Sequence, residues 1–238
     1  MIGGFIIYGD LPKKIILRAI GPSLASFGIV DAMPNPELRL YDSTGSIVGY
    51  NDDWRSDQRQ IIEATGLAPS DDREAAIVVT LPPGAYTASV SDANDNSGVA
   101  LFDLYDLDSA SSELINLSTR GKVDTGNRVM IGGFIIGGDQ STPIVIRAIG
   151  PSLVPAGIAG ALIDPALELY NSEGTLILQN DDWRSDQEQQ LLNSGLAPSD
   201  NRESAIITTL APGSYTGIVR GTNNSTGIGL FEIYKLVQ

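Results

Sequence analysis

Short apolar runs, many of them alternating with polar residues, are separated along the whole chain by clusters of Gly, Pro, Asn and Asp. Alternation with a period of two places one set of side chains inward and the other outward, which is the pattern of a half-buried β-strand. It is clearest at Tyr86, Ala88 and Val90, which we expect to face a core, while Ser89 and Ser91 face solvent. The pattern predicts an all-β chain of short antiparallel strands.

The first half of the chain contains the expected strands and one short helix. The strands are predicted at residues 3–8, 14–20, 37–42, 46–51, 75–81, 85–91 and 99–107. The helix is predicted at residues 58–65, with Asp57 as its N-cap, Gln60 completing a capping box and Gly66 ending it in the left-handed conformation. A twin helix is expected at residues 187–194, and each helix should cover one end of its sandwich.

The second half of the chain repeats the first. The segment NDDWRSDQ at residues 51–58 returns letter for letter at residues 180–187, and a shift of 129 positions (Met130 minus Met1) aligns the copies without a gap. This period is much longer than a solenoid repeat, so each copy is expected to be a whole domain. We predict two tandem antiparallel β-sandwich domains, jelly-roll-like and each with one short helix, at residues 1–108 and 130–238, joined by a linker at residues 109–129.

The linker contains a further expected strand at residues 114–121, which begins with Leu114, Ile115, Asn116 and Leu117. If this strand belongs to the second domain, the first domain lacks an edge strand that its twin has, and an unpaired edge is a template for another chain. Four explanations stay open: trimming upstream of Met1, filling by residues 114–121 themselves, filling by a neighbouring molecule in a head-to-tail polymer, or a tolerated open edge. Because Met1 aligns inside the repeat, we expect the chain to be a mature or trimmed portion.

Composition removes several classes of function. The net charge of −14 disfavours binding to nucleic acid and to anionic membranes, and no apolar run is long enough to insert into a bilayer. The chain contains neither histidine nor cysteine, so serines beside turns, such as Ser23 and Ser152, lack the usual general base. We therefore expect a protein that is not an enzyme.

Two resemblances indicate the biological setting. Residues 40–45 (LYDSTG), 51–53 (NDD) and 83–87 (PGAYT), with their copies, resemble β-sandwich domains of the bacterial pre-peptidase C-terminal type, which implies a jelly-roll-like, non-catalytic appendage of secreted peptidases. The whole unit, from LINLSTRG through IGGFII, RAIGPSL, NDDW and APG-x-YT, is similar to a repeat module of large secreted or surface proteins of environmental bacteria. That family implies an extracellular or cell-surface location in modular or filamentous proteins and brings no established activity; the chain itself carries no export signal.

Calcium is the one cofactor that the sequence suggests, because a hard cation prefers several oxygen ligands. The candidate ligands follow the fourth strand of each copy. They are Asn51, Asp52, Asp53 and Asp57 in the first copy and Asn180, Asp181, Asp182 and Asp186 in the second. Their spacing does not match an EF-hand loop, and the alternative is that these residues cap turns or pair with arginines.

Arg18 and Arg147 are the arginines expected to need such a partner. Each shares a strand face with apolar residues, so its stem should be at least partly buried and its guanidinium should contact a carboxylate. This is a structural role.

Trp54 and Trp183 directly follow the acidic pairs, where an indole ring could stack on a sugar. The alternative is that each ring closes the end of a core. The copies also differ in charge: Asp92 and Asp106 of the first copy correspond to Gly221 and Lys235 of the second. This difference favours contacts between unlike rims, and the alternative is drift on solvated faces.

The most economical interpretation is an extracellular structural module that forms a filament, stalk or layer through head-to-tail contacts between copies, with strand complementation as one way to make them. The alternative function is a calcium-assisted carbohydrate-binding or adhesion module, with a glycan as its partner.

Overall fold

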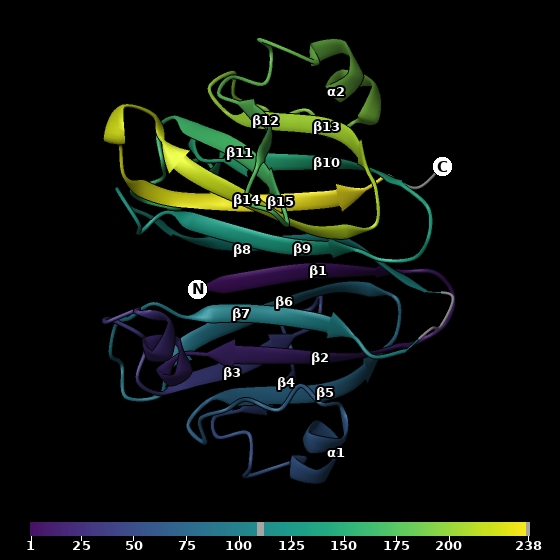
Figure 1. Cartoon of the computed structure of the whole chain (residues 1–238), viewed down its shortest axis with the longest axis vertical. Helices are drawn as coiled ribbons and strands as arrows, with labels where there is room; N and C mark the ends of the chain where they lie inside the picture. Colours follow the sequence, from purple (N-terminus) through teal and green to yellow (C-terminus); the bar gives the residue numbers. More distant parts are fainter. Residues whose placement is uncertain (109–111, 237–238) are drawn as a thin grey trace. The chain divides into compact units, whose positions relative to one another are not determined.

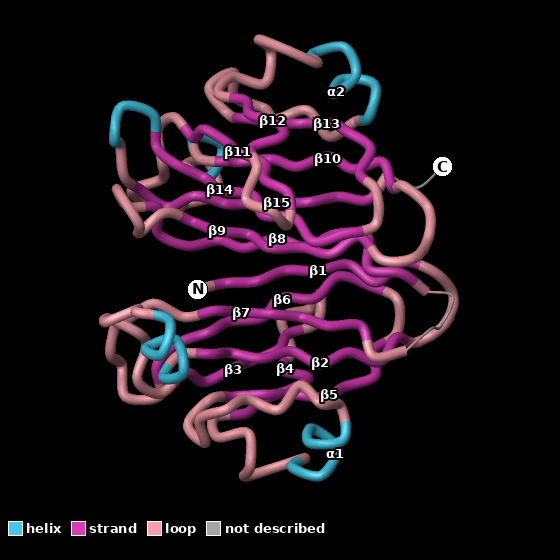
Figure 2. The backbone as a smooth tube through the Cα atoms, in the orientation of Figure 1, coloured by secondary structure: helices cyan, strands magenta, loops and turns pink. Residues whose placement is uncertain are grey.

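The structure is a computed structural model that describes residues 1–108 and 112–236. Its contacts divide the chain into two compact units, Met1–Ile115 (unit 1) and Asn116–Gln238 (unit 2), and strands dominate both (Figures 1 and 2). The division falls inside the linker expected at residues 109–129, whose first three residues, 109–111, lie outside the described residues. The two units are described separately below.

Unit 1 is built from two antiparallel sheets. Its elements are β1 (Ile2–Tyr8), β2 (Lys13–Ile20), the 3-10 helix η1 (Pro22–Phe27), β3 (Pro36–Tyr41), β4 (Ile47–Asn51), α1 (Arg59–Ala64), β5 (Ala75–Leu81), β6 (Gly84–Asp92) and β7 (Leu101–Asp106). One sheet has the order β1-β6-β3-β4 and the other β5-β2-β7. The strand positions predicted from alternation agree with these within two residues at each end.

Unit 2 repeats the arrangement with one strand more. Its elements are β8 (Glu113–Val123, which crosses the division between the units), β9 (Met130–Ile136), β10 (Thr142–Ile149), η2 (Pro151–Leu153), β11 (Pro165–Asn171), β12 (Leu176–Asn180), α2 (Glu188–Ser194), β13 (Ser204–Leu210), β14 (Gly213–Gly221), η3 (Thr222–Asn224) and β15 (Gly227–Lys235). The sheets have the orders β13-β10-β15-β8 and β12-β11-β14-β9.

The pairing in unit 2 is that of a long hairpin rolled into a sandwich. The first strand, β8, pairs with the last, β15; β9 pairs with β14, β10 with β13 and β11 with β12. This nesting is the connectivity of an eight-stranded jelly roll. Unit 1 has the corresponding pairs β1 with β6, β2 with β5 and β3 with β4, and its last strand, β7, has no first strand opposite it.

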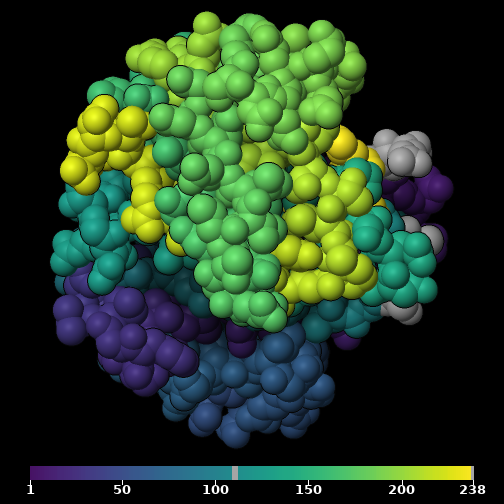
Figure 3. Space-filling model, turned by 45° about the horizontal axis from the view of Figure 1, so that its top comes forward, coloured from purple at the N-terminus to yellow at the C-terminus, as the bar shows by residue number. Residues whose placement is uncertain are grey.

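The main core of each unit lies between its two sheets. In unit 2 it includes Val123 from β8, Phe134 from β9, Leu167 from β11 and Phe231 from β15. In unit 1 the predicted inward side chains of β6, from Tyr86 to Val90, are buried. Figure 3 shows one face of the molecule in space-filling form, coloured along the sequence.

A second apolar cluster lies on the outer face of the β5-β2-β7 sheet, where α1 covers it. The cluster contains Ile62 of α1 and Trp54 of the preceding loop, which pack against Ile16 of β2 and Ala76 and Val78 of β5. The helix was expected to cover one end of the sandwich; it covers a sheet face instead, because the outward residues of β2 and β5 are apolar. Trp183, Leu191 and α2 repeat the cluster in unit 2.

The helix start differs from the sequence prediction. Gln58, at the N-cap of α1, has φ +54°, and no side chain caps the helix; the predicted capping box of Asp57 and Gln60 is therefore absent. The Asp57 carboxylate accepts a hydrogen bond from the backbone N–H of Gln58 at 2.8 Å. Gly66 has the expected left-handed backbone, with φ +71°.

Candidate functional site: the edge of β7 in unit 1

The two units differ most at the edge of their last strand. In unit 2, β8 covers the edge of β15 from Gly227 to Tyr234, with Leu117 opposite Ile233 and Thr119 opposite Phe231. In unit 1, β7 ends the β5-β2-β7 sheet, and no strand among the described residues pairs with its free side. The uncovered edge of unit 1 thus lies at β7.

The side chains of β7 are more exposed than their counterparts in β15. Asp103, Phe102 and Leu104 are partly exposed, whereas their counterparts in β15, 129 positions later, are all buried. Leu101 is 45% exposed, and its counterpart Leu230 is partly buried. A strand beside β7 would bury Phe102, Asp103 and Leu104, as β8 does their counterparts in unit 2.

The backbone of β7 also has groups available for a new strand. In an antiparallel sheet, alternate residues direct their N–H and C=O groups to opposite sides. The N–H of Leu107 donates to the C=O of Lys14 in β2, so the odd-numbered residues of β7 face β2. Phe102 and Leu104 therefore direct their backbone groups to the free side.

The opposite edge of the same sheet is closed by side chains. Gln58 forms two hydrogen bonds with the backbone of Val78 in β5, with its Nε2 donating to the C=O and its Oε1 accepting from the N–H, each at 2.9 Å. Asn51 accepts from the N–H of Ala76 at 3.0 Å. Both amides thus replace a neighbouring strand along β5.

Unit 2 closes β13 with the same device. Gln187 bonds both backbone groups of Ile207, and Asn180 accepts from the N–H of Ala205. The first and last residues of the NDDWRSDQ segment thus cover a sheet edge in both units. Both units close this edge, so they differ at the other edge of the sheet: β8 covers β15 in unit 2, and no described strand covers β7 in unit 1.

Replacing Gln58 by alanine is expected to lower the free energy of unfolding by about 1–2 kcal/mol, because two hydrogen bonds to the backbone of β5 disappear. Denaturation by guanidinium measures the change. Gln60→Ala is the matched control, since Gln60 lies in the same helix and is exposed. Equal stability of the two variants would contradict the edge-cover role.

An ion pair with little exposure to solvent supports the last strand of each unit from its outer face. Arg18 of β2 donates from Nε and Nη2 to the carboxylate of Asp103 at 2.8 and 2.7 Å and from Nη1 to the C=O of Leu67 at 2.7 Å. Burial raises the pKa of Asp103, and Arg18 opposes that shift. Asp103 is the carboxylate that the sequence required for Arg18 without identifying it.

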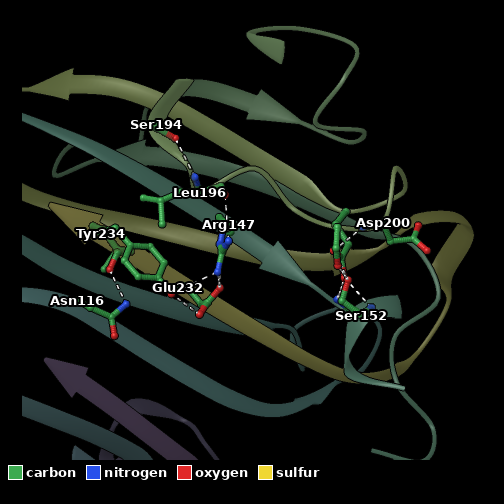
Figure 4. Close-up of polar contacts among 12 residues, drawn as sticks. Asn116, Arg147, Ser152, Ser194, Leu196, Asp200, Glu232 and Tyr234 are labelled. Atoms are coloured by element: carbon green, nitrogen blue, oxygen red, sulfur yellow. Dashed lines mark hydrogen bonds and ion pairs between the residues drawn. The ribbon is translucent and has the colours of Figure 1, made fainter. Parts of the chain in front are cut away.

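The corresponding pair in unit 2 is Arg147 and Glu232 (Figure 4). Arg147 also donates to the C=O of Leu196 at 3.0 Å, as Arg18 does to Leu67. Burial, followed by the charge of Glu232, raises the pKa of Tyr234 to about 12. The side chain of Asn116 in β8 donates to the C=O of Ile233 at 3.1 Å and adds a further bond between β8 and β15.

The sequence did not predict that a further carboxylate in each unit, Glu74 and Glu203, is fully buried. Glu74 is fully buried, and its Oε1 accepts from the N–H groups of Gly21 and Ser23 at 3.1 and 2.9 Å and from the Ser23 hydroxyl. Glu203 binds the GPS segment of unit 2 in the same way. The signal in the sequence was the pairing of an identical GPS segment with a glutamate retained in both copies.

The expected calcium ligands do not gather into one site. Asn51 and Asn180 are used in the edge covers, and the carboxylates of Asp57 and Asp186 accept from the next backbone N–H. Asp181 accepts from the Thr222 hydroxyl at 3.0 Å. Within residues 1–108 and 112–236, no three Asp or Glu side chains are arranged to hold a metal ion.

Asp52 and Asp53 remain next to each other at the end of β4. Asp53 is exposed, and the Oδ1 atom of Asp52 is buried with no hydrogen-bond partner among the described residues. Burial, and then the charge of Asp53, raises the pKa of Asp52. Calcium binding at this position stays a prediction.

The two indole rings lack the exposed face that stacking on a sugar requires. Trp54 is 2% exposed and Trp183 is 1% exposed. Each ring donates its N–H to a backbone C=O, that of Asp71 or Asp200. Both rings fill the outer clusters, which corresponds to the alternative interpretation of these residues.

The expected contrast between acidic and less acidic rims is reduced by internal pairing. Asp92 is buried and accepts from backbone N–H groups, including that of Asn35 at 2.8 Å. Asp106 pairs with Lys13 at 2.7 Å. These two carboxylates serve the fold of unit 1.

One shallow groove of about 520 Å³ lies beside α1 in unit 1, lined by Lys14, Gln60, Ile61, Ala64, Thr65 and Leu107. Lys14 is the only charged residue among these, so the groove offers no acid–base pair. None of the helices that the structure describes is both long and apolar enough to span a bilayer.

Comparisons with known proteins identify no family. No protein-family model and no curated protein matches the sequence. Among solved structures, the chain is similar to the STIV MCP (TM-score 0.29, 11% identity, covering 98% of this chain and 92% of that one). It is also similar to the PBCV-1 virus capsid (TM-score 0.28, 8% identity, 99% and 93%) and to the major capsid protein P2 from Bacteriophage PM2 (TM-score 0.22, 13% identity, 99% and 93%). These TM-scores are too low to support an argument about function.

Proposed function

We propose that the chain is a non-enzymatic structural module of an extracellular filament, stalk or surface layer, in which modules join head to tail. The joint is strand complementation: a strand from a neighbouring molecule pairs with the free edge of β7. The observation that carries the proposal is the difference between the two units, since β8 covers β15 and no described strand covers β7.

Two further features support this proposal. The other edge of the β5-β2-β7 sheet is closed by Gln58 and Asn51, so new pairing is directed to one side of that sheet. Strand addition gives affinity through main-chain hydrogen bonds and specificity through alternate side chains, and it therefore needs no pocket and no cofactor. The extracellular setting rests on the resemblance of the repeat to modules of secreted bacterial proteins.

The test is the molar mass of the chain by light scattering across a concentration series, once in calcium and once in chelator. A second protein carries a copy of residues 113–129 directly before Met1, which supplies unit 1 with the segment that precedes unit 2. We expect the mass of the original chain to rise with concentration in both solutions. The self-complemented chain is expected to remain a monomer, because its β7 edge is filled.

A matched control separates edge filling from the effect of added residues. The same extension with aspartate in place of its two inward apolar residues, the copies of Leu117 and Val123, cannot enter the core and should assemble like the original chain. A monomer at all concentrations, or equal assembly of the original and self-complemented chains, contradicts the proposal. Growth in calcium alone would instead favour the acidic segment at Asp52 and Asp53 as the joint.

A further inference from the structure

The fit of β8 against β15 depends on a glycine. Val123 of β8 is fully buried, and a Cβ atom added at Gly229 would lie 2.9 Å from its Cγ2 atom. Two carbon atoms do not pack that closely, and a β-branched side chain in a filled core has little freedom to turn away. Gly229 therefore provides the space that Val123 occupies.

Unit 1 has a larger residue at the same place. The counterpart of Gly229, 129 positions earlier, is Ala100. The local backbone follows the same path in both units, since the bridge between Ala32 and Val99 corresponds to the bridge between Ala161 and Ile228. On this path, the methyl group of Ala100 would lie as close to a valine equivalent to Val123 as an added Cβ at Gly229 lies to Val123, 2.9 Å.

A second pair of positions supports this correspondence. Gly98 and Gly227 both pass close to a neighbouring chain segment, where an added Cβ would meet the Cα of Met33 at 2.6 Å or the Cα of Leu162 at 2.7 Å. These neighbours are themselves 129 positions apart. The two edges thus follow the same backbone path here, and Ala100 stands in place of Gly229 beside the position of Val123.

We infer that the β7 edge selects a complementing strand that has the inward pattern of β8 but a small residue, Gly, Ala or Ser, in place of Val123. The donor is a segment of a neighbouring polypeptide chain, as the proposed function requires, and the inference rests on that function. In this register Leu104 lies opposite the counterpart of Leu117, and Phe102 lies opposite that of Thr119. The same size difference directs β8 of this chain to unit 2 and keeps the β7 edge available for its partner.

The experiment measures the binding of two labelled peptides to the intact chain by fluorescence anisotropy. One peptide has the sequence of residues 113–124, and the other has alanine at the position of Val123. Each is titrated against the original chain and against the Ala100→Gly chain. The self-complemented chain gives the background, because only its unit 2 edge can exchange strands.

We expect the ratio of valine-peptide affinity to alanine-peptide affinity to be about tenfold higher on the Ala100→Gly chain, which corresponds to about 1.4 kcal/mol. Comparing ratios cancels two other effects, the difference in apolar surface between the peptides and the backbone effect of the new glycine, because each acts equally in both arms. An unchanged ratio, or no binding of either peptide above background, overturns the inference.

The outcome can be separated from that of the proposed function. If the peptides bind with the expected ratio and the original chain stays monomeric, the selectivity of the edge stands and head-to-tail assembly fails. If the chain assembles and neither peptide binds, the inference fails and the assembly uses another surface.

Discussion

Replacing Trp54 by alanine lowers the free energy of unfolding of unit 1 by about 3–5 kcal/mol, the usual loss for a large aromatic residue removed from a core. The ring is almost fully buried against Ile16, Ile62 and Val78 on the outer face of the β5-β2-β7 sheet. It also holds the NDDWRSDQ segment in place, because its indole N–H donates to the C=O of Asp71 at 3.1 Å. The substitution therefore leaves a cavity and loosens the edge cover.

Guanidinium denaturation followed by circular dichroism measures this loss. Trp54→Phe keeps most of the apolar volume and should lose clearly less than Trp54→Ala. Arg55→Ala is a useful control, since it removes the guanidinium that lies 4.8 Å from the ring centre and leaves the indole in place. If Trp54→Ala abolished retention on a glycan matrix without a change in stability, the ring would have the sugar-binding role that its burial disfavours.

Arg147→Ala is expected to lower the free energy of unfolding of unit 2 by about 3–5 kcal/mol, because it leaves a buried carboxylate without its partner. Glu232 is 8% exposed, and its carboxylate accepts hydrogen bonds from Nε and Nη2 of Arg147. The same guanidinium holds the loop at Leu196 after α2. Loss of the arginine therefore affects the strand and the loop together.

The double replacement Arg147→Met with Glu232→Leu should recover most of that loss, since an apolar pair of similar volume needs no charge compensation. Arg59→Ala is the matched control for an ion pair: Arg59 and Glu63 are 56% and 43% exposed, and such pairs contribute less than about 1 kcal/mol. If the single and double replacements were equally unstable, packing of the arginine stem would be the cause, and the charge would not matter.

Strands such as β6 could be predicted from the sequence because period-two alternation records their buried and more exposed faces, whereas β2 and β5 are short apolar runs buried on both faces. The prediction failed where a long-range contact decided the local structure. Asp57 has the sequence of an N-cap, yet the chain turns at Gln58, whose amide is needed at Val78 of β5. A helix boundary of this kind depends on a strand 20 residues away.

The candidate site was predictable in outline for a different reason. Comparison of the two copies shows that residues 114–121 have no counterpart before Met1, and this counting requires no knowledge of side-chain contacts. The carboxylate partners of Arg18 and Arg147 could not be predicted from the sequence, because each lies 85 residues away in the chain. The roles of Asn51 and Gln58 were missed because covering a sheet edge leaves no local pattern; the only signal was an identical segment in both copies.

The nested pairing of the jelly roll has a consequence for how the chain folds. The outermost pair of unit 2 joins residues 104 positions apart (Gly227 minus Val123), so the sandwich cannot close until the whole unit has left the ribosome. Such distant contacts form late and slowly. Unit 1 reaches its last strand without that closure, and under the proposed function the slowest step of its folding becomes a bimolecular one, set by the concentration of the incoming strand.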